Sequence, residues 1–161
     1  MSTQKFDPDR ASRFTRKSLR LQTHNYSWTG TYHVILRAKE HTPLFEIPKL
    51  RLILQEEWEA LSQRFCNVTL DEFMIMSDHI HLLISLEGNM ENAASLPDVI
   101  GAYKSCVFKQ WYKHIKAEKL ECAAQFWQHR YFDRIIRDGQ DFERTRQYIR
   151  DNPTKIIPTD W

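Results

Sequence analysis

The 161-residue sequence predicts an α+β protein, with a ferredoxin-like antiparallel sheet of the split βαβ type and an added C-terminal helix that carries a tyrosine. Three observations lead to this prediction. The expected elements follow the order β-α-β-β-α-β-α, both helices between strands are amphipathic, and one strand is apolar on only one side. Two crossover helices would cover one face of the sheet and leave the other face for the last helix and a substrate.

The first half of the predicted domain contains a strand, a helix and a hairpin. Residues 30–37 alternate β-branched and aromatic side chains with others, which is typical of a strand. Apolar residues at spacings of three and four over residues 47–64 indicate an amphipathic helix. A second strand over residues 73–76 turns at a tight Ser-Asp pair into a third strand that begins at His79. The second and third strands therefore form a hairpin.

The second half of the predicted domain contains a helix, a strand and a final helix. The helix is expected from Leu96 to about Lys116, with an apolar inner stripe and a basic outer side. Residues 116–124 are expected to form a loop. Residues 126–136, which are rich in aromatic residues and arginine, are predicted to be the fourth strand, and residues 142–151 the last helix.

The third strand carries two histidines, His79 and His81, on one side, because successive side chains of a strand point to opposite faces. Two neutral imidazoles at this separation can hold one divalent metal ion. By spacing alone, the solvated side of a half-buried strand is the commoner interpretation. A second observation favours a site, because Tyr148 and Asn152 are four residues apart and share one face of the last helix.

Three segments of the chain resemble one family. They are the strand motif His79-Ile80-His81, the segment FWQHRYFDRIIRD at 126–138 and the ending QYIRDNPTK at 147–155. In this order and at these distances they resemble the HUH single-tyrosine transposases, specifically the REP-associated tyrosine transposases, over most of residues 28–155. The resemblance implies a metal-dependent enzyme that cleaves and rejoins single-stranded or hairpin REP-type DNA through a 5′-phosphotyrosine intermediate, with a free 3′-hydroxyl.

The resemblance also implies roles for particular residues. It makes Tyr148 the nucleophile, and His79, His81 and Asn152 the metal ligands. Relatives often have glutamine at the third ligand position, and an asparagine before a proline is also a common helix end. Two imidazoles and an amide favour Mn²⁺ by affinity, whereas abundance and phosphate chemistry favour Mg²⁺. One of these two ions is therefore the expected cofactor.

Positive charge is distributed unevenly along the chain. The net charge is only +2, but residues 1–28 hold six basic and two acidic residues. We therefore expect a basic arm over residues 1–27, a transposase-like domain over 28–155 and a tail over 156–161. A solvated terminus, a solvated lysine face and an ordinary exposed arginine are the alternatives to DNA contact. The residues expected to contact DNA are Arg13, Arg16, Lys17, Arg20, Lys104, Lys109, Arg130, Arg134 and Arg144.

Other features of the sequence narrow the class of protein. Three cysteines without a CxxC pattern, no signal peptide and no apolar run near 18 residues predict a cytoplasmic protein without membrane contact. The resemblance to the transposases implies a bacterial, nucleoid-associated protein. A monomer or a homodimer is expected. Two further functions fit the same residues: a domesticated DNA-binding protein of this fold that no longer cleaves, and an RNA-binding or ribonuclease module, although no RNP1-like segment is present.

Overall fold

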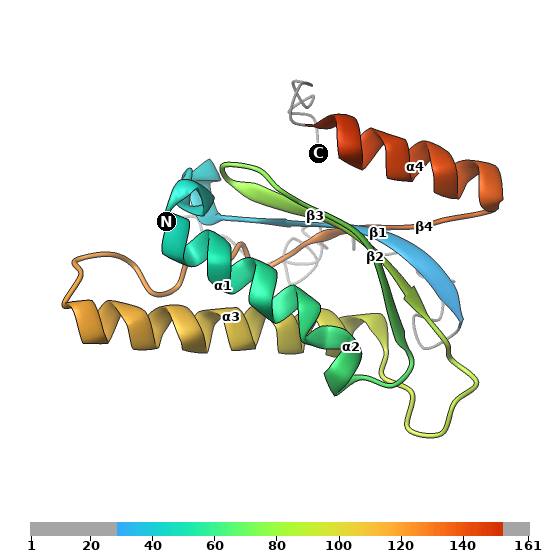
Figure 1. Ribbon diagram of the computed structural model, residues 1–161, viewed down its shortest axis with the longest axis horizontal. Coiled ribbons are helices and arrows are strands. Elements are labelled where there is room, and N and C mark those ends of the chain that lie inside the picture. Colours follow the sequence, from blue (N-terminus) through green and yellow to red (C-terminus); the bar gives the residue numbers. More distant parts are fainter. Residues whose placement is uncertain (1–28, 153–161) are drawn as a thin grey trace, which may run out of the picture.

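The computed structural model describes residues 29–152, and in this part of the chain a four-stranded antiparallel sheet has helices on both of its faces (Figure 1). The strands are β1 (Gly30–Arg37), β2 (Val68–Ile75), β3 (His79–Leu86) and β4 (Phe132–Ile135). Their order across the sheet is β2-β3-β1-β4, so β1 and β3 are central. This topology confirms the ferredoxin-like fold that the sequence predicts.

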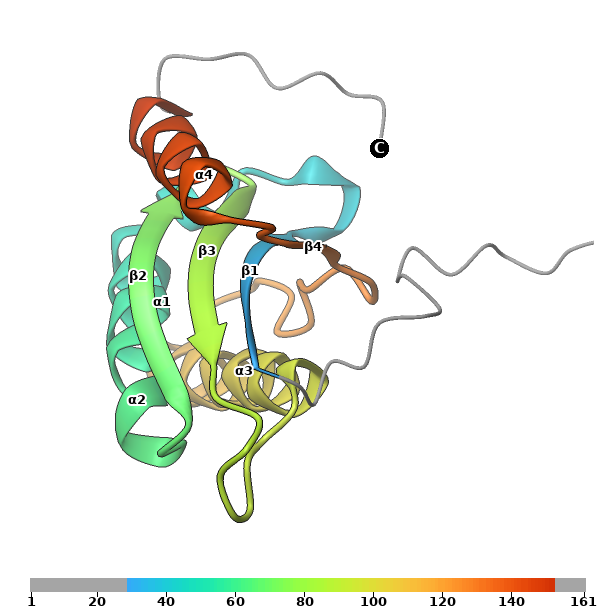
Figure 2. The ribbon, with the colours of Figure 1, turned by 90° about the vertical axis from the view of Figure 1, so that its right-hand side faces the viewer.

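The helices form two layers on opposite sides of the sheet. The crossover helices α1 (Pro48–Glu59) and α3 (Leu96–Glu118) lie on one side, as does the short helix α2 (Leu61–Arg64), and α4 (Gly139–Asp151) lies on the other (Figures 1 and 2). Two single turns of 3₁₀ helix, η2 (Lys39–His41) and η3 (Leu44–Glu46), precede α1. No helix within residues 29–152 has the length and apolar character needed to cross a membrane.

The core lies between the sheet and the two crossover helices. The apolar stripe predicted for the first helix is buried there, and Tyr103 of α3 is fully buried with its hydroxyl donating to the carbonyl of Leu54, 2.9 Å away. α3 begins with a capping box, in which the Ser95 hydroxyl accepts from the amide of Asp98 and the Asp98 carboxylate accepts from the amide of Ser95. The Tyr103 hydrogen bond joins α3 to α1, so the two crossover helices form one layer beneath the sheet.

Several element boundaries differ from the sequence-based expectations. The strand predicted over residues 126–136 is reduced to β4, because Phe126 and Trp127 turn into the core and only one bridge joins Trp127 to Ala38. The helix predicted over 47–64 is interrupted at Ala60, which separates α1 from α2. α4 begins earlier than predicted, because the Asp138 side chain caps it by accepting from the amide of Asp141.

The second strand also differs from its prediction. β2 starts at Val68, several residues earlier than expected, and its pairing with β3 is shifted between Leu70 and Phe73. This irregularity is a β-bulge that contains Asp71 and Glu72. A bulge changes the direction of the side chains it contains, and both carboxylates of this bulge make ion pairs with α4.

Candidate active site

Alternation along β3 separates an apolar side from a side that carries histidines. Ile80, Leu82 and Ile84 are fully buried in the core beneath the sheet. His79 and His81 project from the other face, under α4, and are also buried. The two imidazoles therefore lie on one face of the sheet, as the alternation of side chains along a strand predicts.

A third histidine, His33 of β1, lies beside His81. Its Nε2 is 2.9 Å from Nδ1 of His81, and the two rings are stacked with their centroids 5.2 Å apart. On the other side of the His81 ring, Nε2 is 2.5 Å from the side-chain Nδ2 of Asn152, which directly follows α4. Both nitrogens of His81 are thus hydrogen-bonded, one to a neighbouring strand and one to the end of α4.

His79 is oriented from the turn that precedes it. Its Nδ1 lies 2.6 Å from a carboxylate oxygen of Asp78, and the second carboxylate oxygen is 2.9 Å from Nδ1 of His41. A carboxylate that accepts from Nδ1 leaves the lone pair of Nε2 free to bind an ion. The Nε2 atom of His79 is buried and has no hydrogen-bond partner within residues 29–152.

The three imidazoles are neutral at neutral pH. Burial, and then the charge of Arg134, lowers the pKa of His33 to about 4. Burial lowers the pKa of His81 to about 2, with smaller contributions from His33 and His79. Burial also lowers the pKa of His79, although the hydrogen bond with Asp78 acts in the opposite direction. A neutral imidazole is the form that binds a metal ion.

The start of α4 is attached to the edge strand β4. Arg134 of β4 donates from Nη1 to both carboxylate oxygens of Asp141, at 3.0 and 2.9 Å, and from Nη2 to the hydroxyl of Thr145, at 2.7 Å. Asp141 also accepts from the backbone amide of Arg137. Arg134, which we expected to contact DNA, therefore makes three hydrogen bonds within the protein that hold the first turns of α4.

The second half of α4 is attached to the opposite edge of the sheet. Arg146 forms a two-pronged ion pair with Asp71 of the β2 bulge, at 3.0 and 2.9 Å, and Arg150 pairs with Glu72. Because β4 and β2 are the two edge strands, these contacts attach α4 to both edges of the sheet, and the helix lies above β2 and β3 (Figure 2). From this position α4 contacts His33 and His81 through Tyr148.

Tyr148 lies on the part of α4 that crosses the histidines. Its half-buried ring meets His33 and His81 edge-on, with centroid separations of 6.2 and 5.9 Å. Asn152 is fully buried one turn further along. The fold therefore gathers Tyr148, Asn152, His79 and His81, as the sequence pattern led us to expect.

The gathered residues fit a divalent metal ion. The side-chain Oδ1 of Asn152, like Nε2 of His79, is buried without a hydrogen-bond partner in the described chain. Leaving a buried polar atom unpaired costs about 1–3 kcal/mol, and these two atoms, on residues that both adjoin His81, are a nitrogen and an oxygen of the kinds that ligate divalent ions. Residues 29–152 contain no group of three His, Cys, Asp or Glu suited to a metal ion, and the side chain that adjoins the two histidines from α4 is the amide of Asn152.

The other residues expected to contact DNA are widely distributed. Arg130 and Arg144 are exposed and make no hydrogen bond or ion pair within the described residues, and Lys109 is exposed on α3. Lys104 donates to the carbonyl of Gln128, 2.8 Å away. Both lysines belong to the helical layer on the far side of the sheet from α4 (Figure 1). Arg13, Arg16, Lys17 and Arg20 lie outside the described residues.

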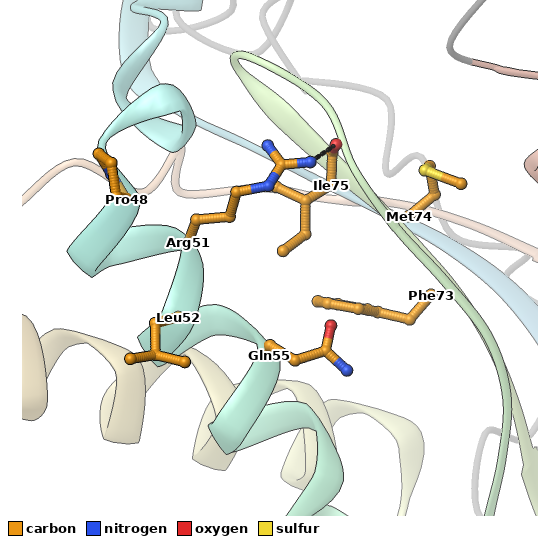
Figure 3. Close-up of a pocket in the computed structure, with 7 residues that line it drawn as sticks. All are labelled: Pro48, Arg51, Leu52, Gln55, Phe73, Met74 and Ile75. Carbon is orange, nitrogen blue, oxygen red and sulfur yellow. Dashed lines mark hydrogen bonds between the residues drawn. The ribbon is translucent and has the colours of Figure 1, made fainter.

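A separate hollow lies beside the edge strand β2. It is an open pocket of about 460 Å³ between α1 and β2, in which Arg51 donates to the carbonyl of Ile75, 2.9 Å away (Figure 3). Its other lining residues are Pro48, Leu52, Gln55, Phe73 and Met74. None of the gathered histidines, and neither Tyr148 nor Asn152, lines this pocket, so it is distinct from the candidate active site.

Sequence reasoning missed two residues of the site, His33 and Asp78. The sequence places His33 in the predicted first strand, on one face with Ile35, but spacing along one strand does not reveal which strand lies next to it. The observed pairing sets Ile35 opposite His81 and so brings His33 diagonally beside it. Asp78 was predicted only as a turn residue, although a carboxylate directly before a candidate ligand histidine is a recognisable signal.

The fold is shared with solved structures of transposases. A REP-associated tyrosine transposase bound to a REP hairpin matches with a TM-score of 0.56 and 17% identity, over 83% of this chain and 72% of that one. A proposed transposase of Deinococcus radiodurans R1 matches with a TM-score of 0.54 and 16% identity, over 82% and 97%. At these identities the matches show the fold alone.

The sequence identifies the family. The profile of the family described as "Transposase IS200 like" matches residues 26–152, and the chain therefore belongs to the IS200-like transposases, a class of DNA-processing enzymes. An uncharacterised protein of Haemophilus influenzae is 27% identical over an alignment 158 residues long, and the match covers 86% of this chain and 88% of that protein. The residues that match the family profile, 26–152, include every residue of the candidate active site.

Proposed function

We propose that this transposase is a metal-dependent transesterase that cleaves and rejoins single-stranded DNA through a 5′-phosphotyrosine intermediate at hairpin sequences of the REP type. One observation carries the proposal: Nε2 of His79 and Oδ1 of Asn152 are buried without a partner in residues 29–152, and both residues adjoin His81, whose ring also meets that of Tyr148. The hairpin substrate is inferred from the REP-associated transposase of the same fold, which was solved with a REP hairpin.

The proposed reaction exchanges one phosphate ester for another. The Tyr148 oxygen attacks the phosphorus, the bond between phosphorus and the 3′-oxygen breaks, and the strand is left with a free 3′-hydroxyl. The proton that the phenol loses balances the proton that the 3′-oxygen gains. Rejoining reverses these changes, since a 3′-hydroxyl attacks the phosphotyrosine and releases the phenol. No oxidation or external energy source is needed, because the ester bond is conserved throughout.

Some residues of the chain would hold the ion that stabilises charge on the phosphate, and others would orient the ligands and the nucleophile. His79, His81 and Asn152 would hold the divalent ion, which supplies Lewis-acid stabilisation to the phosphate when it is bound. Asp78 keeps Nε2 of His79 free of its proton by accepting from Nδ1. Tyr148 lies in the last turn of α4 and Asn152 directly follows the helix, so the attachment of this helix fixes nucleophile and ligand relative to each other.

Exposed basic side chains near α4 would contact the DNA backbone. Arg144 lies one turn before Tyr148 and has no partner among residues 29–152, so its guanidinium is available to a phosphate. Arg130 is similarly exposed in the segment before β4. The basic arm would add further contacts of the same kind. Arg134 is committed to Asp141 and is best regarded as an anchor of α4.

The direct test is the formation of a covalent complex with DNA. The purified chain is incubated with labelled REP-type hairpin DNA and Mn²⁺ or Mg²⁺, and denaturing electrophoresis then separates free from protein-linked label. We expect a protein-linked species that needs the divalent ion and disappears with EDTA. A matched double-stranded oligonucleotide without the hairpin should give much less product. Tight DNA binding with no covalent species under any divalent ion would show a protein that binds but does not cleave.

A further inference from the structure

His33 has no role in the proposed chemistry, yet it is one of the most enclosed polar residues in the protein. It lies in the centre of β1, is only 5% exposed, and touches residues from three other elements. His81 of β3 stacks on it, and Phe132 of β4 and Tyr148 of α4 meet its ring edge-on. A leucine would fill this space without the cost of burying an imidazole, so a specific use of its nitrogen atoms is indicated.

The hydrogen bonds of His81 indicate how a nitrogen atom of His33 is used. A neutral imidazole carries one N–H, so only one of its two nitrogens can donate and the other must accept. Nε2 of His81 faces the side-chain amide of Asn152 and accepts from it. Nδ1 must then hold the proton, and the atom in position to accept it is Nε2 of His33, 2.9 Å away.

We propose that His33 is a positioning residue that fixes His81 as the Nδ1–H tautomer and thereby keeps Nε2 of His81 unprotonated, so that its lone pair, which accepts from Asn152 in this structure, can bind an ion when the Asn152 amide turns its oxygen inward. This proposal rests on the proposed function for the purpose of the site, but not for the tautomer itself. In this arrangement the lone pair of His33 Nε2 accepts the Nδ1 proton of His81, so His33 acts on His81 and not on the ion. As an uncharged acceptor it fixes the tautomer without adding a negative charge where a phosphate has to bind.

Two variants of His33 separate positioning from packing. His33→Leu keeps the apolar volume but cannot accept a hydrogen bond. His33→Gln places an amide oxygen near the position of Nε2 and can accept it again. Thr31→Val is the matched control, because it removes another cross-strand hydrogen bond, the 2.7 Å contact with Ser85, on the same face of the same two strands. Thermal unfolding establishes which of the variants are folded.

The first measurement uses the full chain without metal or DNA. Long-range ¹H–¹⁵N correlation spectra of ¹⁵N-labelled protein report which nitrogen of His81 carries the proton. We expect the proton on Nδ1 in the unmodified chain and in His33→Gln, and loss of this preference in His33→Leu. A proton on Nε2 of His81 in the unmodified chain overturns the proposal. This result requires no folded variant and no catalysis, so it is decided independently of the transesterase function.

The second measurement is Mn²⁺ affinity by isothermal titration. Removing the partner of a metal-ligating histidine typically weakens metal binding about 10- to 100-fold. We expect a weakening of this size in His33→Leu, recovery to within a few fold in His33→Gln, and no change in Thr31→Val. Equal affinity in folded His33→Leu and the unmodified chain contradicts the proposal. If the unmodified chain binds no Mn²⁺, the metal dependence of the proposed function fails, while the tautomer of His81 still decides the role of His33.

Discussion

At the scale of single residues, the candidate site contains two buried histidines, His79 and His81, whose Nδ1 atoms have different hydrogen-bond partners. His81 is enclosed between His33 and Asn152, whereas His79 is held by the Asp78 carboxylate and keeps Nε2 unpaired. The two proposed ligand histidines are therefore oriented by different partners. The neutral imidazole of His33 orients His81, and the anionic carboxylate of Asp78 orients His79. Loss of either ligand should remove the metal site while the apolar core, on the other side of the sheet, is retained.

The first prediction concerns metal binding by His79. His79→Ala should abolish Mn²⁺ binding measured by isothermal titration, because it removes one of three ligands, and it should leave the circular dichroism spectrum nearly unchanged. His41→Ala is the control, since His41 also contacts Asp78 but is exposed and lies outside the site. Undiminished Mn²⁺ affinity in His79→Ala would show that the ion, if bound, is held elsewhere.

Residue spacing predicted part of this site because its geometry is local. Alternation along a strand puts His79 and His81 on one face, and a separation of four puts Tyr148 and Asn152 on one side of a helix. The role of His33 was not predictable, because it depends on which strands pair and in which register. Strand pairing is set by contacts far apart in sequence, and a single sequence does not reveal them.

At the scale of elements, α4 is a helix held more by ion pairs than by apolar packing. Its buried residues are Asp141, Thr145 and Ile149, of which only the last is apolar. Arg134 attaches its start to β4, and the β2 bulge attaches its second half through Arg146. The bulge was not predictable from the alternation pattern, because one extra residue inside a strand changes the pairing without an obvious sequence signal.

The second prediction tests this attachment. Arg146→Ala removes the two-pronged contact with Asp71 and should lower the free energy of unfolding at low salt, with a smaller effect at high salt. Amide exchange in α4 should accelerate. The matched variant Arg144→Ala, on the same helix but without a partner in residues 29–152, should change neither quantity. Equal effects of the two variants would mean that the ion pairs do not hold the helix.

At the scale of the whole molecule, the two faces of the sheet have different roles in the protein. One face and the crossover helices form the core, and the other presents the candidate site beneath α4 (Figure 2). Lys104 and Lys109 lie in the core-side layer, so DNA at the site would have to extend around the molecule to reach them. The fold class followed from the order and periodicity of the elements, whereas the distribution of charge around the molecule required the three-dimensional arrangement.

The third prediction concerns the basic arm, which lies outside the described residues. Removing residues 1–20 deletes six basic and two acidic residues, and it should weaken DNA binding and flatten its salt dependence. On single strands, each lost phosphate contact reduces the slope of log affinity against log salt by about 0.7. Cleavage at saturating DNA should persist. A salt slope equal to that of the full chain would show that the arm does not contact DNA.

The central claim is that Tyr148 forms the covalent bond to DNA, and mapping of the trapped protein–DNA adduct tests it most directly. Proteolysis and mass spectrometry should place the nucleotide on the peptide that contains Tyr148. Tyr148→Phe removes one oxygen and keeps the ring against His33 and His81, so it should retain Mn²⁺ and DNA binding while it loses the adduct. A nucleotide mapped to Tyr131, Tyr112 or a serine, or cleavage by Tyr148→Phe at the rate of the unmodified chain, would contradict the account.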